Sequence, residues 1–330
     1  FYLSFNIYKS QKLYFMNEET IKVILPMRMC GERIDSSLAE MLPHLSRSKI
    51  TSSIKAGLAL LNNNSFKPKD KVCGNDIVTI SLSQKESTTW APEKIPLDIA
   101  YEDDDIIVIN KPFGIVTHPG AGNWNGTLAN ALLSYDSNLS KLDRAGIVHR
   151  LDKNTSGLMV VSKNTKSQKF LVEQLQSHSV EREYSAIVYG HMISGGSINE
   201  PIGRDPKDRV KQAVLTNGKE SITHYRAIDR FQSHTHVKAI LETGRTHQIR
   251  VHLSHIGHPL IGDPIYGGRV RFPKKASLEL KDELINFQRQ ALHSKKLTLT
   301  HPSTGQSMSW KADLPVDMQQ LLSTLKKYDS

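Results

Sequence analysis

The sequence contains few cysteines and no long apolar stretch. Its 330 residues include only two cysteines, Cys30 and Cys73, which lie far apart in the chain. They have no metal-ligand spacing and form no disulfide framework, as is usual in a reducing compartment, and we expect both to be buried or half-buried. No apolar run approaches the roughly 18 residues that a membrane helix needs. The sequence therefore predicts a cytoplasmic protein without a membrane partner.

Acidic residues are also in short supply relative to basic ones. Lys and Arg number 43 against 33 Asp and Glu, giving a formal net charge of +10. A polyanion is the natural partner for such a chain, and nucleic acid is the leading candidate. Composition alone leaves open a basic protein that has no such partner. The length is sufficient for about two domains with a substantial core.

The amino end is unusual because no methionine precedes Met16, where a polar stretch begins. The aromatic residues before it lack the compact apolar core and the cleavage site of a signal peptide. We expect residues 1–27 to be a disordered or poorly packed leader, with a non-native start before Met16.

A small module is expected over residues 28–83. The predicted elements are helices over 32–45 and 46–57, the second capped by Ser46, and strands over 58–61 and 77–80. No acidic residue occurs from Met41 to Lys69. The basic candidates for phosphate contact are Arg47, Lys49 and Lys55. A cationic face on a two-helix unit favours a clamp on a phosphate backbone, although a solvated basic face would give the same pattern.

Beyond a polar linker at 84–97, residues 98–330 are expected to form one mixed domain. Strands are predicted over 105–110, 158–162, 184–189, 223–228 and 235–241, and helices over 127–133, 168–176 and 246–256. Strands dominate and the helices fall between them irregularly. This pattern indicates an α+β fold built on a largely antiparallel mixed sheet.

The most informative stretch is Gly-Ile-Val-His-Arg-Leu-Asp-Lys-Asn-Thr-Ser, residues 146–156. It places the carboxylate of Asp152 beside His149 and Arg150 in one short loop between apolar runs. Loops that gather ionisable groups on a rigid scaffold are common sites of chemistry, although a plain surface turn is the alternative.

Two further clusters of ionisable residues argue against a plain surface turn. Lys111 to Pro119 forms a rigid loop after a strand and includes His118. Glu242 to His247 joins a strand to a helix capped by Thr246, and Arg245 there could hold a carboxylate ionised. A surface ion pair is the competing interpretation of Arg245. The nearby histidines at 247, 252, 255 and 258 do not share one helix face and indicate satisfied side chains rather than a metal site.

With these clusters assembled, the chain resembles the pseudouridine synthases that modify ribosomal and transfer RNA, and among them the large-subunit type. The motifs are His149-Arg150-Leu151-Asp152-Lys153 with Thr155-Ser156-Gly157, Glu242 to His252, Gly262 to Gly267, Arg289 to His293, and His301-Pro302. The resemblance extends from about residue 31 to the carboxyl end. The module at 28–83 resembles the S4 RNA-binding domain.

The resemblance implies a role for each matching residue. Asp152 would be the catalytic aspartate and Arg245 its charge partner. Arg150 would help to displace the target uridine from its stack, and Tyr184 would pack beside the base. His149, Lys111 and His118 are further candidates for substrate or RNA contact. The implied reaction needs neither a cofactor nor a metal.

The implied function is isomerisation of 23S rRNA uridines to pseudouridine, in the intersubunit-bridge stem-loop by family analogy. The protein would act as a monomer without an obligate protein partner. A synthase for other rRNA or tRNA uridines is one alternative. An RNA-binding ribosome assembly factor with incidental or no catalysis is another, and a metal-dependent hydrolase is a distant one.

Overall fold

The structure is a computed structural model that describes residues 14–17, 20–43, 45, 47–81, 90–120 and 122–329. The chain divides into two compact units, Phe1–Thr88 and Thr89–Ser330, and each is described by itself. In the described ranges, no helix is long and apolar enough to cross a membrane.

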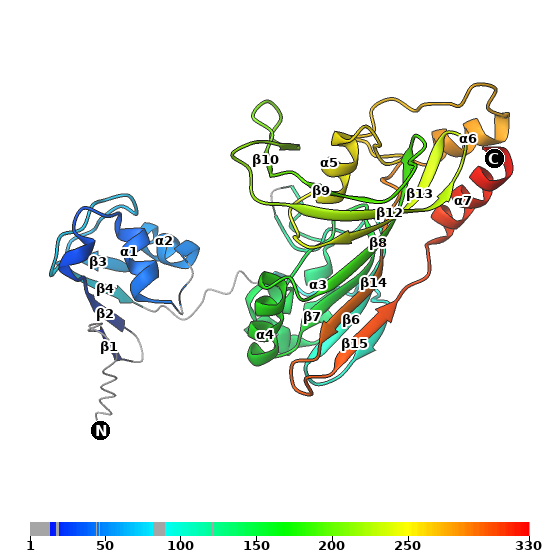
Figure 1. The fold of residues 1–330 in the computed structure, drawn as a ribbon. Coiled ribbons are helices and arrows are strands. Elements are labelled where there is room, and N and C mark those ends of the chain that lie inside the picture. The colour runs from blue at the N-terminus through cyan, green and yellow to red at the C-terminus, as the bar shows by residue number, and fades with distance from the viewer. Residues whose placement is uncertain are drawn as a thin grey trace. The chain divides into compact units, whose positions relative to one another are not determined.

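The smaller unit is an antiparallel sheet with two helices (Figure 1). Its strands follow the order β1-β2-β4-β3. The elements are β1 (Tyr14–Asn17), β2 (Thr20–Ile24), the 3₁₀ turn η1 (Met27–Met29), α1 (Ile34–Met41), α2 (Arg47–Lys55), β3 (Ala59–Leu61) and β4 (Ile77–Ser81). Ile50 and Ile54, four residues apart on α2, are both buried in its core, as the helical spacing predicted.

The expected leader boundary at residue 27 was wrong. Strand β2 pairs with β4, and its alternate residues Ile21 and Val23 have no exposed surface in the core of the smaller unit. Residues 1–13 and the expected cap Ser46 lie outside the described residues. The expectation that the cysteines are buried was also wrong, because Cys30 and Cys73 are both exposed.

The larger unit contains a nine-stranded sheet in the order β5-β6-β7-β14-β8-β13-β12-β9, with β15 paired to β14. Its strands are β5 (Ile99–Glu102), β6 (Ile106–Lys111), β7 (Ser156–Ser162), β8 (Glu181–Tyr189), β9 (Gly196–Asn199), β12 (Ile222–Arg230), β13 (His234–Leu241), β14 (Leu292–Thr300) and β15 (Ser307–Lys311). A separate hairpin pairs β10 (Ile202–Arg204) with β11 (Gln212–Val214). The β7–β14 pair is parallel and the other pairs of the large sheet are antiparallel. The predicted largely antiparallel α+β architecture is thus confirmed.

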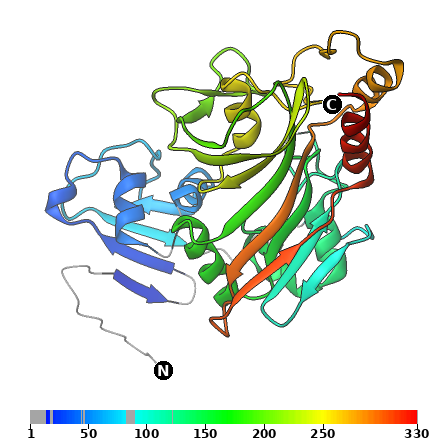
Figure 2. The ribbon, with the colours of Figure 1, turned by 45° about the vertical axis from the view of Figure 1, so that its right-hand side comes forward.

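Helices cover both faces of the large sheet. They are α3 (Leu128–Tyr135), α4 (Thr165–Gln176), α5 (Gln248–His255), α6 (Leu278–Asn286) and α7 (Val316–Tyr328), with 3₁₀ turns η2 (Ser137–Lys141) and η3 (Asp143–Gly146). Residues of α3 and α5 share one core cluster with one face of the central strands, whereas α4, α6 and α7 contribute to the clusters on the other face. Figure 2 shows the two C-terminal helices, coloured orange and red, beside each other at one end of the sheet.

The alternation of strand β8 decides which side chains reach the face covered by α3 and α5. Tyr184, Ala186 and Val188 belong to the core of that face, whereas Ile187 and Tyr189 belong to the core beneath α6 and α7. The period of two therefore places Tyr184 on the α3 and α5 side.

The stretch expected to be a linker contacts the larger unit from residue 90 onwards. Trp90 and Leu97 pack against its core. The Asn130 side chain donates to the Ala91 carbonyl at 2.8 Å, and the Glu93 amide donates to the Asn130 carbonyl at 3.0 Å. Residues 82–89 lie outside the described part of the chain.

Candidate active site

Asp152 lies in the loop between η3 and β7, and this loop is tied to its neighbours through backbone groups. The Thr117 hydroxyl, from the loop after β6, donates to the Leu151 carbonyl at 2.8 Å. The Thr155 amide donates to the Asp152 carbonyl at 3.0 Å, closing a turn around the carboxylate. Side chains on rigidly held loops are positioned with little freedom, so the Asp152 carboxylate has a defined location.

Arg250 is the charge partner of Asp152. Its Nη1 lies 3.0 Å from Asp152 Oδ2, while Nε and Nη2 bind the two oxygens of Asp263 at 2.7 and 2.9 Å. Burial alone would raise the pKa of Asp263, but the hydrogen bonds and charge of Arg250 hold it below its usual range. His247 Nε2 lies 3.9 Å from Asp152 Oδ1 on the other side. One fixed guanidinium therefore joins a buried carboxylate to a partly exposed one.

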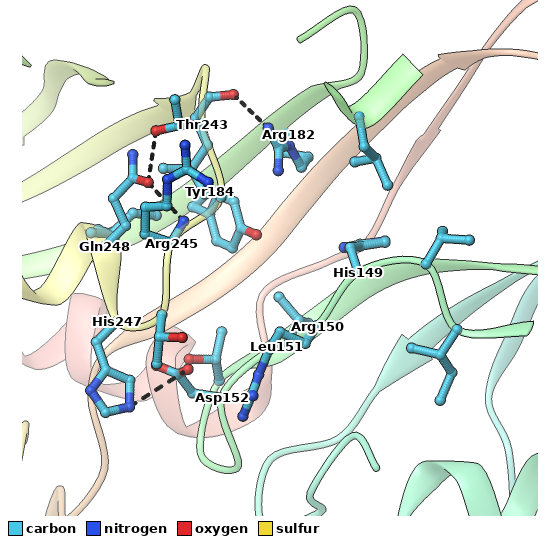
Figure 3. A pocket seen from close by; sticks show the side chains of 18 of the residues that line it. His149, Arg150, Leu151, Asp152, Arg182, Tyr184, Thr243, Arg245, His247 and Gln248 are labelled. Atoms are coloured by element: carbon cyan, nitrogen blue, oxygen red, sulfur yellow. Dashed lines mark hydrogen bonds and ion pairs between the residues drawn. The ribbon is translucent and has the colours of Figure 1, made fainter. Parts of the chain in front are cut away.

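Tyr184 projects from β8 toward the space above Asp152 (Figure 3). The ring is 5% exposed, and burial raises the pKa of its phenol above the ordinary value. The hydroxyl is thus protonated at neutral pH and can donate a hydrogen bond.

Two cavities meet at Asp152. The first has a volume of about 530 Å³ and includes Tyr184 and Arg182 in its wall; the second has a volume of about 480 Å³ and extends toward Val210. Both are within the size range of ligand sites. Residues that line both are His118, Arg150, Leu151, Asp152, His247 and Arg250. The carboxylate can therefore reach a group bound in either cavity.

Comparisons with known proteins show which family the chain belongs to. Residues 105–255 match the family model described as RNA pseudouridylate synthase. The protein named ribosomal large subunit pseudouridine synthase D from Xanthomonas campestris pv. campestris is 47% identical over 306 residues, which cover 93% of this chain and 92% of that protein. The protein of the same name from Yersinia pestis is 52% identical, covering 90% and 91%. The chain belongs to the RNA pseudouridylate synthase family.

Solved structures of similar fold agree with this family assignment. Human RNA pseudouridylate synthase domain containing 4 matches with a TM-score of 0.54 and 25% identity, over 69% of this chain and 93% of the human one. Human RNA pseudouridylate synthase domain containing 1 matches with a TM-score of 0.53 at 22% identity, over 71% and 96%. The chain is therefore an RNA pseudouridine synthase, an isomerase with an RNA substrate, and the assignment to this family from its motifs is confirmed.

Arg245, which the sequence indicated as the partner of Asp152, does not pair with it. The side chain is exposed at the cavity wall, and its Nε donates to the Glu220 carbonyl at 3.0 Å. The chain turns between Arg245 and Arg250, because His247 adopts a left-handed φ of 59° at the N-cap of α5. This turn directs Arg250, in the first turn of the helix, toward Asp152 instead. Thr246 is not the cap residue.

Arg250 was missed although it lies inside the quoted motif. The available signal was its place next to Ile249 on a helix whose apolar positions predicted burial. A buried arginine usually has a carboxylate partner.

The expectation that Lys111 contacts RNA was wrong. Its side chain has no exposed surface, and Nζ donates to the carbonyls of Pro112, Ile115 and Lys153 at 2.8, 3.0 and 3.2 Å. Burial lowers the pKa of Lys111 to about 7. Lys111 thus joins the loop after β6 to the loop that carries Asp152.

Arg150, His118 and His149 all line the first cavity but differ in their freedom. Arg150 is exposed and borders both cavities. His118 is half-buried, and burial together with the charge of Arg150 lowers its pKa. His149 Nε2 accepts a hydrogen bond from the Val160 amide at 3.0 Å. Burial lowers the pKa of His149 to about 3, so the ring is neutral. His149 is therefore held by a backbone contact, whereas Arg150 lies exposed at the edge of both cavities.

Three of the four histidines on or near α5 make hydrogen bonds within the protein, and the fourth, His255, is exposed. His252 bonds Thr223 and the Glu200 carbonyl, and His258 bonds the Tyr189 carbonyl. His247 bonds the Tyr266 hydroxyl at 2.8 Å. The interpretation of satisfied side chains thus agrees with His247, His252 and His258.

The basic candidates of the smaller unit all lie on α2. Arg47 is about half-exposed and its Nη2 lies 3.1 Å from Asp35 Oδ1, whereas Lys55 is exposed. Lys49 is part of α2, but its side chain lies outside the described residues.

Proposed function

We propose that this synthase isomerises uridines of 23S rRNA to pseudouridine, in the stem-loop of the intersubunit bridge. The observation that carries the reaction is the Asp152 carboxylate, held by Arg250 where two cavities meet. The target is supported by relatives named for the large ribosomal subunit, about half identical to this chain over nine-tenths of its length. Such a target places the activity in the bacterial cytoplasm.

Asp152 is the proposed nucleophile, and its chemistry requires one carboxylate. An Asp152 oxygen forms a bond to C1′ as the N1–C1′ bond breaks and its electron pair stays on the uracil. The base turns, C5 bonds to C1′, and the carboxylate leaves. C5 then loses its proton and N1 gains one, so that the product is an isomer of the substrate. Arg250 contributes by donating a hydrogen bond that orients the carboxylate.

Arg150 and Tyr184 handle the base in this proposal. The target uridine has to leave its stack, which costs a few kcal/mol, and the exposed Arg150 at the rim can fill the space that it vacates. Tyr184 packs beside the extruded base. Its protonated hydroxyl acts as a donor rather than as a base.

The smaller unit is proposed to be an S4-like RNA-binding module. Support comes from its two helices packed on a short sheet and from two cations of α2, the exposed Lys55 and the half-exposed Arg47. Phosphate contacts of this kind position RNA without reading its sequence.

Mapping pseudouridine in rRNA and tRNA tests the target. RNA from cells with the gene, without it, and complemented with either wild type or Asp152→Ala would be compared. Loss in the intersubunit-bridge loop that only wild type restores is the expected result. Loss at other rRNA or tRNA uridines would contradict the target but not the reaction, whereas restoration by Asp152→Ala would favour a binding role.

A further inference from the structure

Arg182 is a buried guanidinium in the wall of the first cavity. It lies on β8 two residues before Tyr184, so both side chains leave the strand on the same face (Figure 3). It is 5% exposed, and its Nη2 donates to the Glu242 carbonyl at 3.0 Å and toward the Leu241 carbonyl at 3.4 Å. Its Nε is buried and has no hydrogen-bond partner in the described part of the chain.

No carboxylate of the described residues pairs with this charge. Arg250 has two acidic partners, whereas within the described ranges no carboxylate lies within 4.0 Å of Arg182, whose hydrogen bonds go to carbonyl oxygens. The cavity neighbours His149 and Tyr184 do not compensate it, because burial favours the neutral form of each. A buried cation without a counter-charge is costly, and such groups concentrate where a ligand supplies the missing charge.

The proposed reaction develops negative charge on the base. When N1–C1′ breaks, the electron pair left on the base spreads to the carbonyl oxygens O2 and O4. A charge that develops only during the reaction is best stabilised by a donor fixed beforehand in a site that excludes water. Arg182 has an unused N–H and an unbalanced charge.

We propose that Arg182 donates its free Nε–H to a carbonyl oxygen of the target uracil and stabilises the detached base anion. In this proposal Asp152 bonds to C1′, and Arg182 holds the base after the N1–C1′ bond breaks and until the C5–C1′ bond forms. This inference rests on the proposed function.

Gly244 gives an independent way to disturb the same group. A Cβ built on this residue would lie 2.7 Å from Arg182 Nη1. Because the atom that it meets is the far end of a side chain, Gly244→Ala should shift the guanidinium while the backbone stays in place.

The test compares wild type, Arg182→Met, Arg182→Lys and Gly244→Ala on a synthetic RNA of the intersubunit-bridge stem-loop. Arg226→Met, an exposed arginine on β12 that lines neither cavity, is the matched control. The target uridine is supplied as uridine, 2-thiouridine or 4-thiouridine, because sulfur is a weaker hydrogen-bond acceptor than oxygen. For each combination of enzyme and RNA, kcat and KM are measured. The thermal melting temperature is measured for each enzyme.

Arg182→Met should lower kcat by about 10- to 100-fold with little change in KM, because the charge develops only after binding. Arg182→Lys and Gly244→Ala should lie between it and wild type. One thio-substituted RNA should slow wild type by roughly tenfold and Arg182→Met no further, because the contact is already absent.

Equal slowing of wild type and Arg182→Met by both thio RNAs, or wild-type kcat in Arg182→Met, would overturn the inference. A folded Arg182→Met whose KM rises while its kcat stays at the wild-type value would also overturn the inference. Wild type that makes no pseudouridine in the unmodified RNA would instead overturn the proposed function on which the inference rests.

Discussion

Replacing Arg250 by methionine should damage both folding and turnover, because this guanidinium serves two carboxylates. Its side chain is 4% exposed, Asp263 is fully buried, and Asp152 is 16% exposed. Removing one partner of a buried ion pair leaves the other charge uncompensated, at a cost of about 3–5 kcal/mol. We therefore expect the free energy of unfolding to fall by about this amount.

The pH dependence of that loss has a definite sign. In wild type the pKa of Asp263 is below its usual range, so its contribution to stability is present above the unfolded value of about 3.9 and disappears as the pH falls through the folded value. Without Arg250, burial raises the pKa of Asp263 instead. The stability difference between the two proteins should then be largest at neutral pH and shrink as acid protonates Asp263.

Turnover should fall because Asp152 loses a charge-assisted hydrogen bond at 3.0 Å. A bond of this kind contributes about 1.5–3 kcal/mol, which corresponds to roughly a 10- to 150-fold decrease in kcat. Arg245→Met is the matched comparison, since Arg245 lines the same cavity but binds the Glu220 carbonyl instead of a carboxylate. It should lose less than roughly tenfold by the same argument.

Urea unfolding at pH 5 and pH 8 and single-turnover pseudouridine formation would measure these effects. The reasoning would be refuted if Arg245→Met lost more activity than Arg250→Met at temperatures where both are folded. A stability difference that grew toward low pH would refute the assignment of Asp263.

Two further substitutions test other parts of the account. Lys111→Met should lower the free energy of unfolding by about 1–3 kcal/mol at pH 7, because three buried carbonyls lose their donor. Since the pKa of Lys111 is about 7 in the fold and about 10.4 unfolded, wild-type stability should rise with pH between these values relative to the variant; a parallel course in both would contradict the burial argument. Lys55→Gln should reduce the slope of log affinity against log salt by about 1 without changing kcat, measured by RNA binding at several salt concentrations. An unchanged slope would remove Lys55 from the RNA contacts.

Local patterns in the sequence were sufficient where neighbours in the chain decide the structure. The four-residue spacing of Ile50 and Ile54 located α2, and the apolar runs located β6, β7, β8, β12 and β13 within a few residues. The clustering of Asp152 with ionisable neighbours located the cavity for the same reason.

The failures share a tertiary origin. The alternation of Ile21 and Val23 is a strand pattern, but its burial depends on pairing with β4, more than fifty residues later in the chain. Lys111 looks like an RNA contact by residue type, and only the fold shows that carbonyls surround it. The turn at His247 decides that Arg250 rather than Arg245 pairs with Asp152, and a turn of this kind cannot be predicted from the spacing of apolar residues.

The most direct test of the central claim is pseudouridine formation by purified wild type and Asp152→Asn on the same stem-loop RNA. The substitution keeps the shape of the side chain and replaces the carboxylate that Arg250 binds, and that would bond to C1′, with a neutral amide. The account predicts no pseudouridine from Asp152→Asn at saturating RNA, with an RNA affinity close to that of wild type. Pseudouridine formed by Asp152→Asn at a rate within tenfold of wild type would contradict it.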